Sequence, residues 1–139
     1  MTKAEVCTRI EEIGIIPAVR LHSAEDALFA AEAVSAAGIP IVEVTMTVPG
    51  AVEVIRELTR HRDTVIVGAG SVFHVEKARR CLDAGAAFLT TPGLDLDIVN
   101  FALGRGVVVF PGALTPTEIM TARNAGSDFV KIYPCFGRS

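Results

Sequence analysis

Two residues of opposite charge stand inside apolar, β-branched segments. Lys131 lies within the run FVKIY, and Glu43 lies within IVEVT. A neutral lysine amine can attack a carbonyl carbon to form an imine, and a carboxylate can move protons on and off the reacting groups. The two residue types are therefore suited to carbonyl chemistry, provided that the fold brings their side chains together.

Side chains alternate between the two faces of a strand, so the position of each residue predicts the face it occupies. Glu43 shares its face with Thr45 and Thr47, whereas the opposite face of that segment is apolar. In two other apolar segments, Lys131 shares a face with Phe129 and Tyr133, and Arg20 shares a face with Ile16 and Ala18. This matching of odd and even positions is called parity below. Taken singly, these charges are better explained by a snorkelling lysine, an ion-paired glutamate and a surface arginine. Taken together, they favour a shared site.

A strand-like run followed by a helix-like run recurs along the chain. The expected strands are 14–19, 39–46, 64–70, 86–93, 107–112 and 128–134, and the expected helices between them are 23–38, 50–61, 74–85, 95–106 and 115–126, after an N-terminal amphipathic helix within 1–14. Helix starts are marked by Ser23 and by Thr115, Pro116 and Glu118, which form an N-cap and a capping box. Glycines at the helix ends, Gly38, Gly85, Gly104 and Gly126, are expected to end four of these helices.

Strict alternation of strands and helices predicts parallel strands with right-handed crossovers. An open doubly wound sheet and a (β/α)8 barrel both fit this pattern. Charged residues on one face would be buried under helices in the open sheet, whereas in a barrel they can converge at the carboxyl ends of the strands. We therefore favour an α/β fold in which residues 1–139 form a single, incomplete TIM-barrel domain with six of the eight strands.

Composition argues against several classes of partner. The formal net charge of −3 offers no basic stripe for nucleic acid or an acidic membrane, and no apolar run reaches the roughly 18 residues of a membrane span. The charged N-terminus lacks the apolar core of a signal peptide, so we expect a cytoplasmic protein. The three cysteines, Cys7, Cys81 and Cys135, are widely spaced, and the histidines show no ligand spacing. We expect neither a metal nor a cofactor.

Glycine-rich turns follow several of the expected strands. The turn VGAGSV lacks the full spacing of a dinucleotide fingerprint. Gly68 and Gly70 are instead expected to let the backbone pass close to a ligand, with the hydroxyl of Ser71 available to it. The segments TTPG and FPGALTP are also explained by ordinary turn chemistry.

Five segments together resemble one known family. GIPIVEVTMTVPGA, VIVGAGSV, TTPGLD, FPGALTPTEI and FVKIYPC are similar to the 2-keto-3-deoxy-6-phosphogluconate and 4-hydroxy-2-oxoglutarate aldolase family, in family order and spacing, up to about Cys135. The resemblance implies a class I aldolase, usually a homotrimer, that cleaves a 2-keto acid substrate to pyruvate and an aldehyde through a lysine Schiff base. It leaves the identity of the aldehyde open.

The resemblance also implies roles for individual residues. Lys131 matches the Schiff-base lysine, and Glu43 matches the general acid/base. Among substrate-binding positions, Ser71 replaces a family threonine and Pro92 matches a substrate-contacting proline. Thr47 occupies a position at which some members have a carboxylate-binding arginine. Arg20 matches an arginine found at the end of the first strand in other members, and it is expected to hold the carboxylate instead.

In the family, the lysine strand is followed by a glycine-rich segment and two further βα units, which commonly build a phosphate site. These units are not among the 139 residues of this sequence. We therefore expect unpaired edges on the first and sixth strands, low stability of the isolated chain, and weak or absent activity on phosphorylated substrates. The alternative to an active aldolase is an impaired remnant or a split-barrel fragment that acts through association. A barrel enzyme of another chemistry would leave the matched lysine and glutamate unexplained.

Overall fold

The computed structural model describes residues 1–61 and 65–135 of the chain. Its helices are α1 (Lys3–Ile13), α2 (Ala24–Ala36), α3 (Ala51–His61), α4 (Val75–Asp83), α5 (Leu96–Gly104) and α6 (Pro116–Asn124), and its strands are β1 (Ala18–Val19), β2 (Ile41–Thr45), β3 (Ile66–Gly70), β4 (Phe88–Thr90), β5 (Val108–Phe110), β6 (Gly112–Ala113) and β7 (Lys131–Ile132). Strands and helices thus alternate as predicted.

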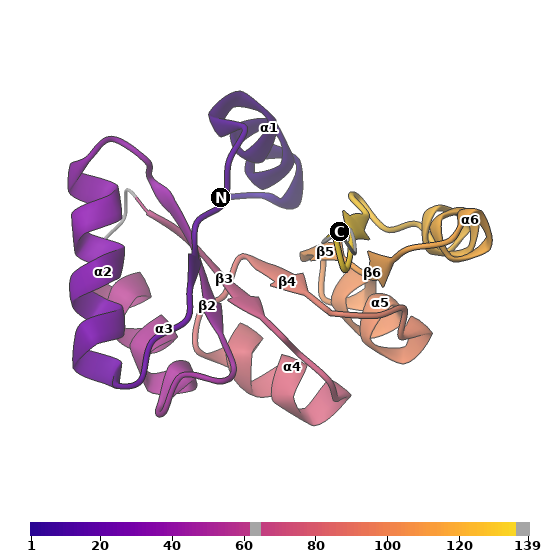
Figure 1. Ribbon diagram of the computed structural model, residues 1–139. Helices are drawn as coiled ribbons and strands as arrows, with labels where there is room; N and C mark the ends of the chain where they lie inside the picture. Colours follow the sequence, from indigo (N-terminus) through magenta and orange to yellow (C-terminus); the bar gives the residue numbers. More distant parts are fainter. Residues whose placement is uncertain (62–64, 136–139) are drawn as a thin grey trace.

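The first five strands form one parallel sheet in the order β1-β2-β3-β4-β5, and β6 and β7 form a parallel pair beside it. Helices α2 to α5 lie along the outside of this curved sheet, while α1 lies on its open side (Figure 1). Sequential parallel strands joined by helices on one side are the arrangement of a (β/α)8 barrel. The predicted α/β barrel-type architecture is confirmed.

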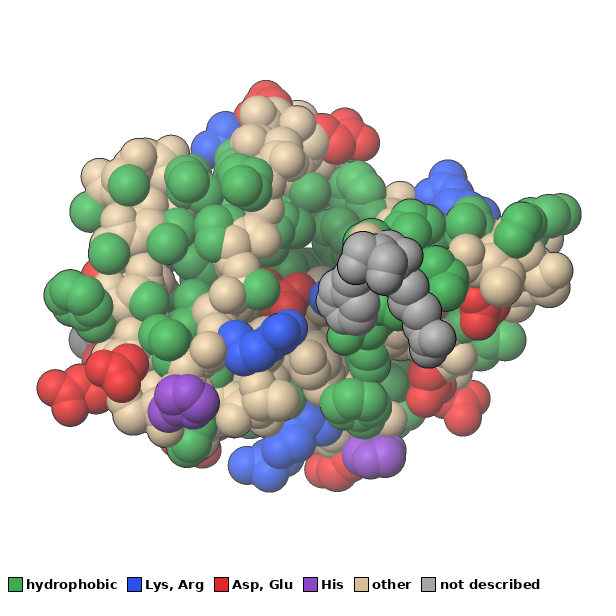
Figure 2. All heavy atoms as spheres, in the orientation of Figure 1, with side chains coloured by type: hydrophobic (Ala, Val, Ile, Leu, Met, Phe, Trp, Pro, Cys, Tyr) green, Lys and Arg blue, Asp and Glu red, His purple; other side chains and the backbone are tan. Residues whose placement is uncertain are grey.

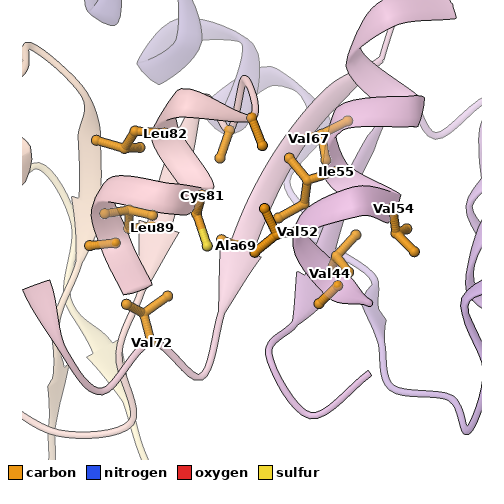
Figure 3. Packing of buried hydrophobic residues seen from close by; sticks show 14 of the residues in the cluster. Val44, Val52, Val54, Ile55, Val67, Ala69, Val72, Cys81, Leu82 and Leu89 are labelled. Carbon is orange, nitrogen blue, oxygen red and sulfur yellow. The ribbon is translucent and has the colours of Figure 1, made fainter. Parts of the chain in front are cut away.

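The outer face of the sheet carries the larger hydrophobic core. Val42, Val44, Val67 and Leu89 point from the strands toward the helices and are buried there with residues such as Ile55. Figure 3 shows Val44, Val67 and Leu89 among the aliphatic side chains that fill the space between the sheet and helices α3 and α4. Removing such side chains from water provides the main driving force that holds the helices on the sheet.

The inner face carries a smaller, separate core. Ile41, Ile66, Phe88 and Val108 point inward from four successive strands, and they pack against Val6 and other residues of α1 and the strands. The helix α1 therefore covers part of the inner face. Because Ile41 and Glu43 have the same parity on β2, the glutamate is directed into the same interior.

The strands are shorter than expected, most clearly the fourth, at Phe88–Thr90, and the sixth, at Lys131–Ile132. In the first and fifth strands a proline accounts for the difference. The first strand is confined to Ala18–Val19, since Pro17 has no N–H to donate, although its carbonyl accepts from the Glu43 N–H at 2.9 Å. The fifth strand was expected as one run over 107–112, and it is divided at Pro111 into β5 and β6.

Hydrogen bonds nevertheless continue across the division at Pro111. The N–H groups of Phe129, Lys131 and Tyr133 donate to carbonyls on the neighbouring segment, and the Lys131 N–H donates to the Pro111 carbonyl at 2.9 Å. Pro111 donates no backbone hydrogen bond to the lysine strand in exchange, because proline has no N–H group. The lysine strand therefore pairs with β6, in register Gly112↔Lys131, rather than with a continuous fifth strand.

Most of the predicted helix boundaries are confirmed by the capping interactions. The Ser23 hydroxyl accepts from the Asp26 N–H, and Thr115 and Glu118 form a complete capping box at α6. The helix α5 ends at Gly104 as predicted, but a different glycine supplies the left-handed turn. Gly104 is the last residue of α5, and the glycine in the left-handed conformation after this helix is Gly106, with φ of 66°.

Candidate active site

Three side chains from separate strands meet on the inner face. The Nζ atom of Lys131 on β7 lies 3.9 Å from Oε2 of Glu43 on β2. The hydroxyl of Thr90, at the end of β4, donates to the same Oε2 at 2.8 Å and accepts from the Lys131 ammonium at 3.5 Å. The residues predicted from parity to face each other are thus brought together, 88 positions apart in the sequence.

Burial differs between the two charged groups. The Glu43 side chain is 6% exposed, whereas that of Lys131 is 29% exposed. Glu43 Oε1 is buried without a hydrogen-bond partner among the described residues. Such an oxygen is costly to leave unpaired and is common at functional sites. The pair therefore consists of a carboxylate fixed in the interior and an amine that reaches toward solvent.

The Glu43 side chain has room because the neighbouring strand β3 has glycine at two positions on the inner face. Glu43 pairs in register with Gly68, and Thr45 pairs with Gly70. A Cβ atom at Gly70 would lie 2.7 Å from Cγ of Glu43 and closer still to its carboxyl group. The glycines predicted to allow close approach thus accommodate protein side chains: Gly70 accommodates Glu43, and Gly68 packs against the ring of Phe88.

Lys131 is positioned by its backbone and by one aromatic neighbour. Its N–H is held by the Pro111 carbonyl, and its ammonium lies 5.5 Å from the centre of the Tyr133 ring. A cation near an aromatic face is attracted by the ring quadrupole, by about 0.5–1 kcal/mol at exposed sites. Figure 2 shows acidic and basic surface adjoining in a hollow on this face of the molecule.

The other predicted site residues follow the carboxyl ends of successive strands. Arg20 follows β1 and is exposed, Thr47 follows β2, Ser71 follows β3, and Pro92 lies two residues after β4. Parallel strands end at the same edge of a sheet, which is where barrel enzymes place their active sites. Over residues 1–61 and 65–135, no hydrogen bond or ion pair joins Arg20 to the lysine–glutamate pair, so its role stays a prediction.

Thr47 and Ser71 line one small pocket of about 200 Å³ at this edge, together with Met46, Phe73, His74 and Lys77. Pro92 lines a neighbouring pocket of about 350 Å³. Ser71 has φ of 56°, a left-handed conformation that is uncommon for a residue with a side chain. Strained backbone of this kind clusters at ligand-binding sites.

A pocket larger than these two lies elsewhere. It has a volume of about 460 Å³ and is lined by residues at the amino ends of β3, β4 and β5, including Ile66, Ala87 and Val107. None of the predicted site residues lines it. Because parallel strands place their chemistry at the carboxyl end, we do not assign this pocket to the site.

Two of the three cysteines are shielded from solvent, Cys81 fully and Cys7 in part. Burial raises the pKa of Cys81 to about 11, and burial with the nearby Asp128 charge raises that of Cys7. Thiols of this kind are poor nucleophiles at neutral pH. Over residues 1–61 and 65–135, no group of three or more potential ligands could hold a metal ion.

Thr90 was not among the predicted site residues. Its parity could have identified it, because it lies two residues after Phe88 and so shares the inward face of β4. The segment TTPG was interpreted as turn chemistry, which describes the neighbouring Thr91: its hydroxyl donates to the Gly93 carbonyl at 2.6 Å. The two adjacent threonines thus serve different purposes.

Comparison with known proteins identifies the class to which this fold and site belong. The family model for KDPG and KHG aldolases matches residues 6–137. A 2-dehydro-3-deoxy-phosphogluconate aldolase of Treponema pallidum is 38% identical over 125 residues, which are 90% of this chain and 60% of that protein.

Solved structures of aldolases share the fold. The 2-keto-3-deoxy-6-phosphogluconate aldolase of Zymomonas mobilis, solved with 3-phosphoglycerate, superposes with a TM-score of 0.85 at 26% identity, covering 96% of this chain and 63% of that one. A KDPG aldolase of Legionella pneumophila, solved with pyruvate captured as a covalent carbinolamine, gives 0.79 at 29% identity, covering 86% and 58%.

The chain belongs to the KDPG and KHG aldolase family, as its motifs indicated. Members of this family are aldolases, which are carbon–carbon lyases acting on small molecules. The 139 residues span about 60% of the length of the curated relatives that they match. The described strands accordingly correspond to part of the barrel seen in the structural relatives.

Proposed function

We propose that this chain carries the catalytic pair of a class I aldolase, in which Lys131 forms a Schiff base with a 2-keto acid and Glu43 is the general acid/base. The substrate is of the 2-keto-3-deoxy-6-phosphogluconate or 4-hydroxy-2-oxoglutarate type, and the products are pyruvate and an aldehyde. The observation that carries the proposal is the 3.9 Å approach of Lys131 Nζ to Glu43 Oε2 inside the barrel-type sheet.

The geometry supports Lys131 over the other two lysines of the sequence. Lys3 lies on α1 and forms an ion pair with Asp128 at 3.0 Å. Lys77 lies on the outer helix α4 and lines the small pocket beside Ser71. Of the three, only Lys131 has a buried carboxylate in an ion-pair contact among the described residues.

The reaction follows from the chemistry of these two groups. The neutral amine of Lys131 adds to the substrate ketone, and loss of water leaves an iminium ion. Glu43 then removes the proton of the C4 hydroxyl while the C3–C4 bond breaks, so that the bonding electrons move into the iminium. The aldehyde leaves, the enamine takes a proton at C3, and hydrolysis releases pyruvate and restores the free lysine.

Substrate binding is assigned to residues at the same edge of the sheet. The hydroxyls of Thr47 and Ser71 and the ring of Pro92 contact the substrate, and the guanidinium of Arg20 holds its carboxylate. Arg20 is suited to this task because guanidinium groups bind carboxylates with two parallel hydrogen bonds. The Legionella pneumophila relative, solved with a covalent pyruvate carbinolamine, supports pyruvate as the common product.

The decisive experiment is reduction with borohydride in the presence of pyruvate, followed by intact mass and peptide mapping. The parent chain should gain one reduced pyruvate adduct, located on Lys131. Lys131→Arg should abolish the adduct, because a guanidinium does not form the imine. Lys3→Met is the matched control and should leave the yield unchanged. A folded parent sample without an adduct on Lys131 would refute the proposal.

A second candidate is a fragment that acts through association, because two strands have open edges in the described structure. Strand β1 pairs only with β2, and β7 pairs only with β6. Ile132 on β7 is 47% exposed. Unpaired strand edges are surfaces on which other chains can pair. A folded chain that forms no adduct alone, but forms one after mixing with a complementary fragment, would favour this second function.

We further propose that the chain works as a homo-oligomer, as a trimer by analogy with the family, in the cytoplasm. Light scattering after size-exclusion chromatography measures the assembly directly, and a strictly monomeric active sample would contradict it. Over the described residues, no helix is long and apolar enough to cross a membrane. We propose no nucleic-acid partner, because the formal net charge is −3.

A further inference from the structure

The direct approach of the catalytic pair is too long for a hydrogen bond. Lys131 Nζ and Glu43 Oε2 are separated by 3.9 Å, and proton transfer between side chains needs about 2.6–3.2 Å or one bridging group. Thr90 Oγ1 lies between the two groups, 2.8 Å from Glu43 Oε2 and 3.5 Å from Lys131 Nζ. The step to the carboxylate is within the transfer range, and the step from the nitrogen must shorten by about 0.3 Å when substrate binds, as catalytic hydrogen bonds of ligand-free enzymes commonly do. The described structure thus contains a three-atom path from nitrogen through the hydroxyl to the carboxylate.

The hydroxyl has the hydrogen-bonding capacity that this path requires. A threonine hydroxyl offers one donor and two acceptor positions. An ionised carboxylate only accepts, so the single donor of Thr90 points to Glu43 Oε2. The lone pairs that remain are open to an N–H of Lys131. The polarity of the path is therefore fixed as N–H to O–H to carboxylate.

The backbone holds the Thr90 oxygen in place. Thr90 is 3% exposed, and its carbonyl accepts from the Val72 N–H at 3.2 Å. On the other side, Thr90 pairs in register with Phe110 of β5. Because the backbone of Thr90 is held from both sides, its hydroxyl can leave the pair only by a change of the side-chain rotamer. By holding Oε2, it also orients the carboxylate and leaves Oε1 as the oxygen that has no partner within the described part of the chain.

We propose that the Thr90 hydroxyl is the proton link between Lys131 and Glu43, a role that rests on the aldolase function proposed above. When the amine adds to the ketone, a C–N bond forms and the nitrogen carries an extra proton. That proton passes to Thr90 Oγ1 as the hydroxyl's own proton passes to Glu43 Oε2, so Thr90 is unchanged. Glu43 then protonates the former ketone oxygen. A second proton, taken from solvent by Glu43, leaves with that hydroxyl as water, and the iminium keeps the positive charge.

The test compares three variants with the parent chain. Thr90→Val keeps the shape and removes the hydroxyl, whereas Thr90→Ser keeps the hydroxyl. Thr59→Val is the matched control, because the Thr59 hydroxyl donates to the Ala84 carbonyl at 2.9 Å and lies outside the site. The assay is exchange of the pyruvate methyl protons for deuterium, followed by NMR, which needs both the imine and the acid/base. Thermal melting monitored by circular dichroism verifies folding.

Loss of the link should appear in the maximum rate rather than in pyruvate binding. General acid–base catalysis contributes about 10²–10⁴-fold, so Thr90→Val should lower kcat for exchange by at least about 10-fold, with KM within about 2-fold. Thr90→Ser should retain kcat within about 3-fold, and Thr59→Val within about 2-fold. If Thr90→Val does not fold, Thr90→Cys replaces it with the same expected loss, because a thiol is a weak donor.

Three results would overturn the link while leaving the aldolase proposal intact: Thr90→Val exchanging as fast as Thr59→Val, Thr90→Ser losing as much as Thr90→Val, or the loss appearing in KM alone. A parent chain that shows neither exchange nor a borohydride adduct would overturn the aldolase proposal, and the link with it. The two failures are therefore distinguished by the behaviour of the parent.

Discussion

Replacing Gly70 by alanine should disable the site without touching either of the charged residues. Gly70 ends β3, and its missing side chain leaves the space into which the Glu43 carboxyl group fits. An alanine Cβ there would lie 2.7 Å from Cγ of Glu43 and nearer still to Cδ and Oε1. Ordinary van der Waals contact begins at 3.4 Å, so Cγ must retreat by 3.4 − 2.7 = 0.7 Å and the carboxyl group by more.

This displacement sets the size of the expected effect. A misplacement of about 1 Å in a catalytic group costs about 10²-fold in rate, so proton exchange in pyruvate should fall about 100-fold in Gly70→Ala. Overpacking of this kind also destabilises a protein by about 1–3 kcal/mol. Lys131 is not displaced directly, so borohydride should still trap some pyruvate on it.

Two further variants isolate the contact between Gly70 and Glu43. Gly104→Ala is the matched control, because no atom lies within 4 Å of a Cβ at that position. It should leave exchange unchanged and keep or raise the melting temperature. Glu43→Ala removes all three atoms that the new Cβ would meet, so the stability cost of Gly70→Ala should fall below about 0.5 kcal/mol in that background.

The reasoning about Gly70 is refuted if Gly70→Ala exchanges pyruvate protons within about 2-fold of the parent. It is refuted equally if the destabilisation is the same with and without the Glu43 side chain. Either result would mean that the carboxyl group has room to move at no cost, and that its observed position is not required for proton transfer.

Three other predictions concern single groups. Glu43→Gln should still form the pyruvate adduct but exchange about 10²–10⁴-fold more slowly, measured by mass spectrometry and NMR. Since burial raises the pKa of Cys81 to about 11, a thiol reagent at pH 8 should modify exposed Cys135 first, and equal rates would contradict this. Hydrogen bonds from the N–H groups of Leu114 and Thr115 lower the pKa of Glu118 below its ordinary value of 4.5. The contribution of the ionised Glu118 to the stability of the folded state is therefore fully present above pH 4.5 and is lost as the pH falls through the lower pKa of the folded state. The difference in melting temperature between the parent and Glu118→Gln should close over that acidic range.

The sequence by itself determined the local features of this protein. The capping box at Thr115 and the N-cap at Ser23 depend on residues within one turn, so both were predicted and confirmed. The faces of Glu43 and Lys131 follow from the two-residue period of a strand, which needs no knowledge of the partner strand. The family motifs added the expected roles, which remain proposals for this chain.

Tertiary structure decided what depends on register between strands. The pairing of β2, β3 and β4 places the Thr90 hydroxyl against the Glu43 carboxylate, and it places Gly70 next to the Glu43 side chain. Neither contact follows from one strand alone, because the register between strands sets which side chains lie opposite each other. The division of the fifth strand at Pro111 likewise required knowing that the lysine strand would pair there. Parity predicts the face of the sheet, whereas the contact between two strands is fixed by packing across the whole barrel-type core.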